Sequence, residues 1–196
     1  LLSRRGAALL GIRGVRAGDA VLIFHPMSAE LYAALLAVLR LGGVAMFLDP
    51  SAGRAHIEQC CRLWPAKAFL ASSKAHLLRL TSASLRKIPL HFAIGSRVPG
   101  AIPWDLSNDN SECATIEPFR KDTPALLTFT SGSTGQPRAA LRSHGFLAAQ
   151  HRILEESLRL SPGESNLATL PIFVLANLGS GVTSVIPDGD LRVPEA

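Results

Sequence analysis

The sequence predicts an α/β protein with a parallel or mixed sheet flanked by helices, and three observations lead to this fold class. Short apolar runs recur along the chain and indicate buried strands, as in Ala20–Phe24 and Leu90–Ile94. Stretches with helical periodicity separate these runs, which is typical of βαβ units. The chain has 196 residues, 47% of them hydrophobic, and this is enough apolar material for a folded core.

Helices and strands are expected to alternate through the first half of the chain. The expected helices are 3–13, 29–41, 56–63 and 74–80, and the expected strands are 20–24, 44–48, 68–71 and 90–94. Ser28 is expected to cap the second helix, with Glu30 in its positive first turn. Because that helix is apolar nearly all round, we expect it to be covered on both sides. Residues 95–123 are rich in Pro, Ser, Asn and Asp, which predicts a surface connection.

The second half predicts strand 125–129, a loop, a returning strand 138–142 and a helix capped by Ser143. One face of that helix is expected to pack against the protein, and its members are Phe146, Leu147, Ile153, Leu154 and Leu158. Residues 166–187 then carry no charge over a length that could span a membrane. Pro171, Asn177 and a Gly-Ser-Gly run divide this segment, so we predict a strand, a helix and a strand of an α/β core.

Charge and cysteine content exclude several classes of protein. Lys and Arg number 20 against 15 acidic residues, but the cations are scattered along the chain and few aromatic residues accompany them, which disfavours nucleic acid as a partner. Phosphorylated small molecules remain compatible. The adjacent pair Cys60 and Cys61 suits neither a disulfide framework nor a zinc site, so we expect reduced core residues of a cytoplasmic protein. The histidines share no metal-ligand spacing, and no metal site is predicted.

The most informative stretch is TSGSTGQPR, residues 130–138, which follows a buried apolar strand. Small residues allow successive backbone N–H groups to point into one concavity and bind anionic oxygens. The hydroxyl groups add donors, and Arg138 adds a positive charge. Neither a Walker A motif nor a Rossmann fingerprint is present. From the residues alone, the loop is either a phosphate cradle or a glycine-rich hairpin turn without a ligand.

The order of residues in this stretch resembles the phosphate-binding motif of the adenylate-forming superfamily, (S/T)-S-G-(S/T)-T-G-x-P-K-G, found in acyl-CoA synthetases, adenylation domains and luciferases. Three further segments of the chain also resemble segments of this family, and they are Gly18–Val21, Leu35–Pro50 and Leu170–Phe173. Asp49–Pro50, Lys74–Leu78 and Thr183–Asp188 resemble the fatty-acid-CoA-ligase-like branch that includes olefin β-lactone synthetases. The resemblance covers nearly the whole chain.

This resemblance implies the partial N-terminal domain of the adenylate-forming fold. Residues 1–196 would be an incomplete AMP-binding domain, with a first βα region (1–94), a connection (95–123) and a phosphate-loop region (124–196). The implied reaction has two steps. A carboxylic acid, a fatty acid by the finer likeness, attacks the α-phosphorus of Mg-ATP and gives acyl-AMP and pyrophosphate. Coenzyme A or another acceptor then takes the acyl group.

The resemblance also assigns site residues. The ATP phosphates would be held by Thr130, Ser131, Gly132, Ser133, Thr134, Gly135 and Arg138, with His144 as a further candidate. ATP and Mg²⁺ are the implied cofactors. The chain departs from the family in having Arg138-Ala139 where Lys-Gly is usual, and Val174 where His or an aromatic residue is frequent.

No catalytic residue and no metal ligand is assigned. The family's magnesium-binding Glu, its ribose-binding Asp and the catalytic Lys of its mobile C-terminal domain would all follow the segments found here. We therefore expect the chain alone not to adenylate a carboxylate, and a separate chain could supply the missing domains. Two alternatives stay open: a degenerate protein that binds a nucleotide or a partner without catalysis, and a truncated product without function.

Overall fold

A computed structural model of the protein describes residues 1–49, 53–107, 116–131 and 136–187. The chain forms two compact units, Leu1–His144 and Gly145–Ala196. The strands of residues 124–143 belong to the same sheet as those of residues 1–94. The candidate loop therefore belongs to the first unit.

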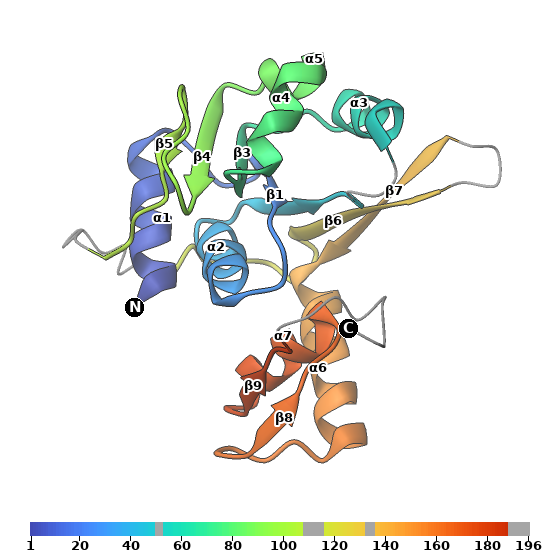
Figure 1. The fold of residues 1–196 in the computed structure, drawn as a ribbon. Coiled ribbons are helices and arrows are strands. Elements are labelled where there is room, and N and C mark those ends of the chain that lie inside the picture. The colour runs from blue at the N-terminus through green and yellow to red at the C-terminus, as the bar shows by residue number, and fades with distance from the viewer. Residues whose placement is uncertain (50–52, 108–115, 132–135, 188–196) are drawn as a thin grey trace, which may run out of the picture. The chain divides into compact units, whose positions relative to one another are not determined.

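The first unit is built on a seven-stranded sheet with the strand order β5-β4-β3-β1-β2-β6-β7 (Figure 1). The strands are β1 (Ala20–Phe24), β2 (Val44–Phe47), β3 (Ala68–Ser72), β4 (Leu90–Ile94), β5 (Ile102–Pro103), β6 (Pro124–Ser131) and β7 (Pro137–Ser143). All neighbours pair in parallel except β6 and β7, which form an antiparallel hairpin at one edge. The predicted fold class is confirmed.

Helices cover both faces of this sheet, as Figure 1 shows. They are α1 (Leu2–Ile12), α2 (Ala29–Arg40), α3 (Gly53–Leu63), the 3-10 turn η2 (Ala75–Leu77), α4 (Leu78–Thr81) and α5 (Ala83–Arg86). The prediction for α2 is confirmed: Ser28 Oγ accepts from the Leu31 N–H at 3.3 Å, and the helix is buried around most of its circumference. The single helix expected over 74–80 is instead η2 and α4, with α5 following.

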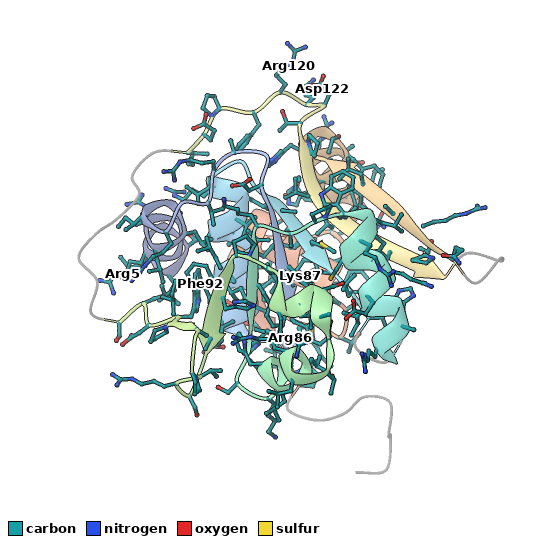
Figure 2. All side chains as sticks on the ribbon, turned by 90° about the horizontal axis from the view of Figure 1, so that it is seen from above. Arg5, Arg86, Lys87, Phe92, Arg120 and Asp122 are labelled. Carbon is teal, nitrogen blue, oxygen red and sulfur yellow. The ribbon has the colours of Figure 1, made fainter. Side chains whose placement is uncertain are left out.

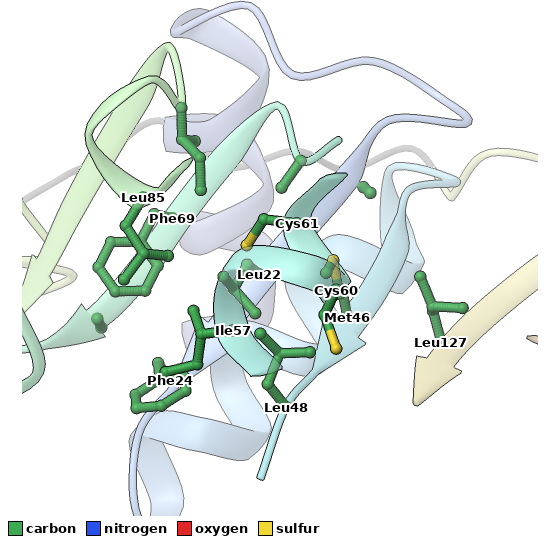
Figure 3. Packing of buried hydrophobic residues seen from close by; sticks show 14 of the residues in the cluster. Leu22, Phe24, Met46, Leu48, Ile57, Cys60, Cys61, Phe69, Leu85 and Leu127 are labelled. Atoms are coloured by element: carbon green, nitrogen blue, oxygen red, sulfur yellow. The ribbon is translucent and has the colours of Figure 1, made fainter. Parts of the chain in front are cut away.

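The core beneath α3 contains alternate residues of four neighbouring strands (Figure 3). Leu22, Met46, Phe69 and Leu127 are completely buried there. Cys60 and Cys61 of α3 pack on the same cluster as free thiols, as the sequence predicted. Burial raises the pKa of Cys60 to about 11 and that of Cys61 to about 12, so both stay protonated and act as small apolar residues.

Residues 102–106, in the connection predicted over 95–123, are held in the fold, which their composition did not indicate. The connection contributes β5, and Trp104 directly after this strand is only 7% exposed. The Trp104 ring meets Phe92 edge to face, with ring centroids 6.0 Å apart. The Arg5 guanidinium also donates to the Leu106 carbonyl at 2.7 Å. An aromatic anchor and an arginine from α1 thus hold a segment whose composition alone predicted a loop.

The second unit contains most of α6 (His144–Leu158), then β8 (Ser165–Leu167), α7 (Pro171–Gly179) and β9 (Thr183–Val185). The strand, helix and strand predicted over 166–187 are confirmed, and β8 pairs with β9 in parallel. The prediction that one face of α6 packs holds only in part, because Leu154 packs but Phe146 is 49% and Ile153 64% exposed. The unit's buried cluster of Leu160, Ala176 and Val182, with Leu154 packed against it, is too small to cover that face.

Within the described ranges, no helix has both the length and the apolar character needed to cross a membrane.

Candidate functional site

The candidate loop joins the two strands of the edge hairpin. β6 runs parallel to β2, with Phe47 beside Thr128, and then extends beyond the end of β2. The turn therefore follows the carboxyl end of a strand in a mostly parallel sheet, which is the edge where α/β proteins commonly bind ligands. The predicted site residues Gly132, Ser133, Thr134 and Gly135 lie outside the described residues.

The described ends of the loop are brought together by the strand register. Thr130 is paired with Arg138, and Ser131 with Pro137. Thr130 and Arg138 are both exposed, so a hydroxyl and a guanidinium face solvent from neighbouring strands where the loop begins and ends. The structure thus brings together these two of the residues that the sequence assigned to phosphate binding.

Alternation along the strands places a second arginine on the same face of the hairpin as Arg138. Side chains two and four positions apart in a strand share a face, so Arg142 lies on that face with Arg138, and Thr128 with Thr130. Arg142 Nη1 donates to Thr128 Oγ1 at 2.7 Å. Arg142 and Thr128 are not among the predicted site residues, although the spacing of four between Arg138 and Arg142 indicates that the two arginines share a face.

His144 lies at the other end of the hairpin. At about 3.3 Å per residue, the length of β7 puts the backbone of His144 roughly 20 Å from that of Arg138. The backbone N–H of His144 donates to the Thr123 carbonyl at 3.0 Å, and the imidazole ring stacks on Phe119 with ring centroids 4.1 Å apart. Burial lowers the pKa of His144. This placement favours a role at the start of α6, and the phosphate contact remains a prediction.

The two departures from the family pattern have clear structural settings. Ala139, which replaces the usual glycine, is an exposed residue of β7 paired with Phe129. Within the described residues the only non-glycine with positive φ is Arg159, so Ala139 introduces no backbone strain. Val174, in the other divergent position, is buried in α7 at 2% exposure, where it packs as a core residue.

A hollow of about 520 Å³ lies near the carboxyl ends of β1 and β4. Its lining includes His25, Glu30, Arg97, Trp104 and Asp105. Hydrogen bonds to its own backbone N–H and to Ser28 lower the pKa of Glu30, while bonds to Ser107 lower that of Asp105. Because these two carboxylates face the hollow, its charge does not suit a polyphosphate, and the hairpin remains the candidate for that ligand.

No group of three or more His, Cys, Asp or Glu residues in the described part of the chain is arranged to hold a metal ion.

The fold and the loop define an α/β protein with a hydroxyl-rich and glycine-rich turn at the carboxyl edge of a mostly parallel sheet. A family model described as AMP-binding enzyme matches residues 1–194. The chain belongs to this family.

Individual relatives agree with this assignment. The olefin beta-lactone synthetase of Xanthomonas campestris pv. campestris is 31% identical over 196 residues, which covers 96% of this chain and 34% of that protein. The 3-hydroxybenzoate–CoA ligase of Aromatoleum sp. is 28% identical, over 96% of this chain and 38% of that protein. The chain thus spans about a third of the length of these relatives.

Solved structures show the same fold. An acyl-CoA synthetase from Brucella canis superposes with a TM-score of 0.82 at 22% identity, covering 96% of this chain and 36% of that one. The N-terminal domain of FACL13 from Mycobacterium tuberculosis gives a TM-score of 0.82 at 19% identity, over 96% of this chain and 49% of that one. At these identities the likeness establishes the architecture alone.

Proposed function

We propose that this chain is the N-terminal portion of an ATP-dependent adenylate-forming ligase, which activates a carboxylic acid as acyl-AMP and releases pyrophosphate. The observation that carries the proposal is the edge hairpin, which places the loop with the family's motif at the carboxyl edge of the sheet between Thr130 and Arg138. A fatty acid as the substrate is the finer proposal, and it depends on the likeness to the fatty-acid-CoA-ligase-like branch.

The reaction requires that the carboxylate and ATP be positioned and that the negative charge of the phosphates be neutralised. An oxygen of the substrate carboxylate attacks the α-phosphorus, the bond between this phosphorus and the bridging oxygen breaks, and the electron pair leaves with pyrophosphate. Donors aimed at the β- and γ-phosphates stabilise the charge that develops on the leaving group. In this proposal Thr130 and the residues 131–135 supply hydroxyl and backbone N–H donors to those phosphates.

Arg138 would supply positive charge at the same place. Its guanidinium is exposed at the end of the loop and free to turn toward a bound polyphosphate. Arginine presents a planar fork of donors where the family's usual lysine presents a compact ammonium group, so the phosphate contact is kept while its geometry changes.

Partners and location belong to the same proposal. The acyl acceptor would be coenzyme A or another acceptor, and a separate chain could complete the catalytic machinery. We propose a cytoplasmic protein, since Cys60 and Cys61 are buried thiols without a disulfide.

The proposal is tested by isothermal titration of the purified chain with Mg-ATP and with pyrophosphate. We expect both ligands to bind, and the double variant Ser133→Ala/Arg138→Ala to weaken binding by about tenfold or more, because it removes one hydroxyl donor and one charge-assisted contact. Arg138→Lys should retain most of the affinity. Arg152→Ala, which removes an exposed arginine of α6, is the matched control and should bind as the parent chain does.

A pyrophosphate-exchange assay with a panel of fatty and aromatic acids completes the test. We expect no exchange by this chain alone, because no catalytic residue is assigned to it. Absence of nucleotide binding by the folded chain, or binding that the double variant retains, would refute the role assigned to the loop.

A further inference from the structure

The first unit contains a long segment with positive charges and no negative ones. Residues 59–104 include seven Lys or Arg residues and no Asp or Glu, although the whole chain has 20 of the former against 15 of the latter. In sequence these cations are spaced widely enough to look scattered. The fold brings several of them together around η2, α4 and α5.

The same helical segment exposes two large apolar side chains. Leu77 is 63% and Leu80 73% exposed, and they are three residues apart across η2 and α4, so they lie along one side of the segment. Inward-facing neighbours fix this orientation: His76 is buried with its Nε2 on the Phe92 carbonyl, and Leu85 is fully buried. The outward leucines therefore have no role in the core.

Three exposed cations belong to the same helical segment as these leucines. Lys74 precedes η2, while Arg86 and Lys87 stand at the end of α5 (Figure 2). Arg86 Nη1 donates to the Leu80 carbonyl at 3.4 Å, which places the guanidinium directly beside the more exposed leucine. We call Lys74, Leu77, Leu80, Arg86 and Lys87 the leucine–basic patch.

In the described part of the chain, no carboxylate forms an ion pair with a cation of the patch. Glu58 of α3 accepts hydrogen bonds from the Ser82 hydroxyl at 2.6 Å and from the N–H and hydroxyl groups of Ser84. Its oxygens are thus engaged at the start of α5, while the three cations of the patch remain exposed.

We propose that the leucine–basic patch is a docking surface for an anionic lipid bilayer. Exposed leucines on one segment with exposed lysine and arginine match the two parts of such a surface, because the leucines enter the boundary of the acyl chains and the cations meet acidic headgroups. A nucleic acid would use the cations but gain nothing from Leu77 and Leu80, since base stacking requires aromatic side chains. The attachment is peripheral and does not depend on the proposed ligase activity.

The test is sedimentation of the purified chain with large unilamellar vesicles in the absence of nucleotide. Vesicles of phosphatidylcholine alone are compared with equal mixtures of phosphatidylcholine and phosphatidylglycerol. We expect binding to the anionic vesicles only, weakening as the salt concentration rises. A separate titration with double-stranded DNA measures binding to a polyanion that has no apolar phase.

Two variants separate the parts of the patch. Lys74→Gln/Arg86→Gln/Lys87→Gln should reduce vesicle partitioning by about fivefold for each charge removed. Leu77→Ala/Leu80→Ala should reduce it by about tenfold at unchanged net charge, through the loss of apolar insertion. The leucine variant is the decisive one, because a purely electrostatic surface would not respond to it.

Matched controls remove similar groups elsewhere. Arg13→Gln/Lys121→Gln/Arg152→Gln removes three exposed charges, and Ile12→Ala removes a side chain that is 70% exposed on α1. Both should bind vesicles at least half as well as the parent chain, and circular dichroism should show all variants folded. The proposal is overturned if the chain ignores anionic vesicles, if the leucine variant binds them unchanged, or if controls and patch variants lose binding equally.

Discussion

His76 and His91 lie with their ring centroids 6.2 Å apart, and each also meets the buried ring of Phe69, so the three rings form a triangle. Each ring places Nε2 3.0 Å from a backbone carbonyl oxygen, that of Phe92 for His76 and that of Leu85 for His91. Carbonyl oxygens only accept, so each Nε2 carries a proton and donates. Both imidazoles can therefore be satisfied in their neutral form while buried.

This pair makes stability depend on pH. Burial is the main cause that lowers the pKa of both histidines in the folded protein, and the charge of Arg79 adds to it. The unfolded chain therefore binds more protons than the folded one, so this stabilisation is complete above the unfolded pKa of about 6.5 and is lost as the pH falls through the lower folded values. We expect the free energy of unfolding to fall between about pH 7 and about pH 5.

Urea unfolding across this pH range measures the effect. The double variant His76→Gln/His91→Gln should be less stable at neutral pH but should show a flatter pH dependence between about pH 7 and about pH 5. His56→Gln is the control, since His56 lies outside the buried pair on α3. A parent chain with constant stability over this range would contradict the prediction.

The elements of the first unit were largely predictable because their signals are local. Ala20–Phe24 and Leu90–Ile94 are continuous apolar runs, and the structure has strands with these same bounds. β5 was missed because two residues carry no periodicity, and its position depends on Trp104 meeting Phe92, a contact between separate segments. The packing face of α6 was predicted correctly only for Leu154, because periodicity indicates which residues could pack, while the available partner surface decides whether they do.

The candidate site was predictable in a different way. The loop motif identified residues 130–138, but the placement of Thr130 opposite Arg138 depends on the register of two strands. Arg142 escaped notice since its partner Thr128 lies 14 residues away in sequence and is adjacent only in the hairpin. His144 is close to the loop in sequence, since it is two residues after Arg142. In the structure, however, the length of β7 separates His144 from the loop.

Gly6 of α1 lies where this helix packs closely against α2 and Trp104. A Cβ built on it would lie 2.8 Å from Trp104 Cζ2 and 2.9 Å from the Ala37 Cβ of α2. In an exposed helix Gly→Ala stabilises by about 1 kcal/mol, but here the methyl group has no space, and we expect Gly6→Ala to destabilise the protein by roughly 1–3 kcal/mol. Chemical denaturation measures the change.

Gly11 in the same helix is the matched control. Its built Cβ meets only Leu41 Cδ2, at an ordinary 3.7 Å. Gly11→Ala should therefore leave stability unchanged or raise it by up to about 1 kcal/mol. The same sign for both substitutions would contradict the packing argument.

Glu58 joins α3 to α5 through two serines. The hydrogen bonds from Ser82 and Ser84 lower the pKa of its carboxyl to about 2. Because the folded pKa is depressed, the stabilisation is present above the unfolded value of about 4.5 and is lost as the pH falls toward about 2. Glu58→Gln should cost about 1 kcal/mol at neutral pH, after allowance for solvent screening, and should reduce the loss of stability in acid.

Glu156→Gln on the exposed surface of α6 should change neither quantity. Thermal unfolding at neutral and acidic pH distinguishes the two variants. If Glu58→Gln unfolds like the parent chain at both pH values, the contact with Ser82 and Ser84 does not stabilise the packing of α3 against α5.

The second unit should open more readily than the first. Its sheet consists of β8 and β9 alone in the described part of the chain, and parallel strands are normally members of larger sheets covered on both faces. Leu167 is 67% and Val185 50% exposed on these strands, so little apolar burial opposes local opening. Hydrogen exchange followed by mass spectrometry should show β8 and β9 exchanging about a hundredfold faster, or more, than β1 and β3.

The edge strand β7 provides the comparison for this experiment, because it also has only one hydrogen-bonded neighbour but belongs to the seven-stranded sheet. If exchange depends only on being an edge strand, β7 should behave like β8 and β9. If it depends on the size of the sheet and its core, β7 should be the better protected. Equal protection of β8, β9 and the central strands would mean that the exposed leucine and valine are covered in solution, and the premise of a weakly stabilised second unit would be wrong.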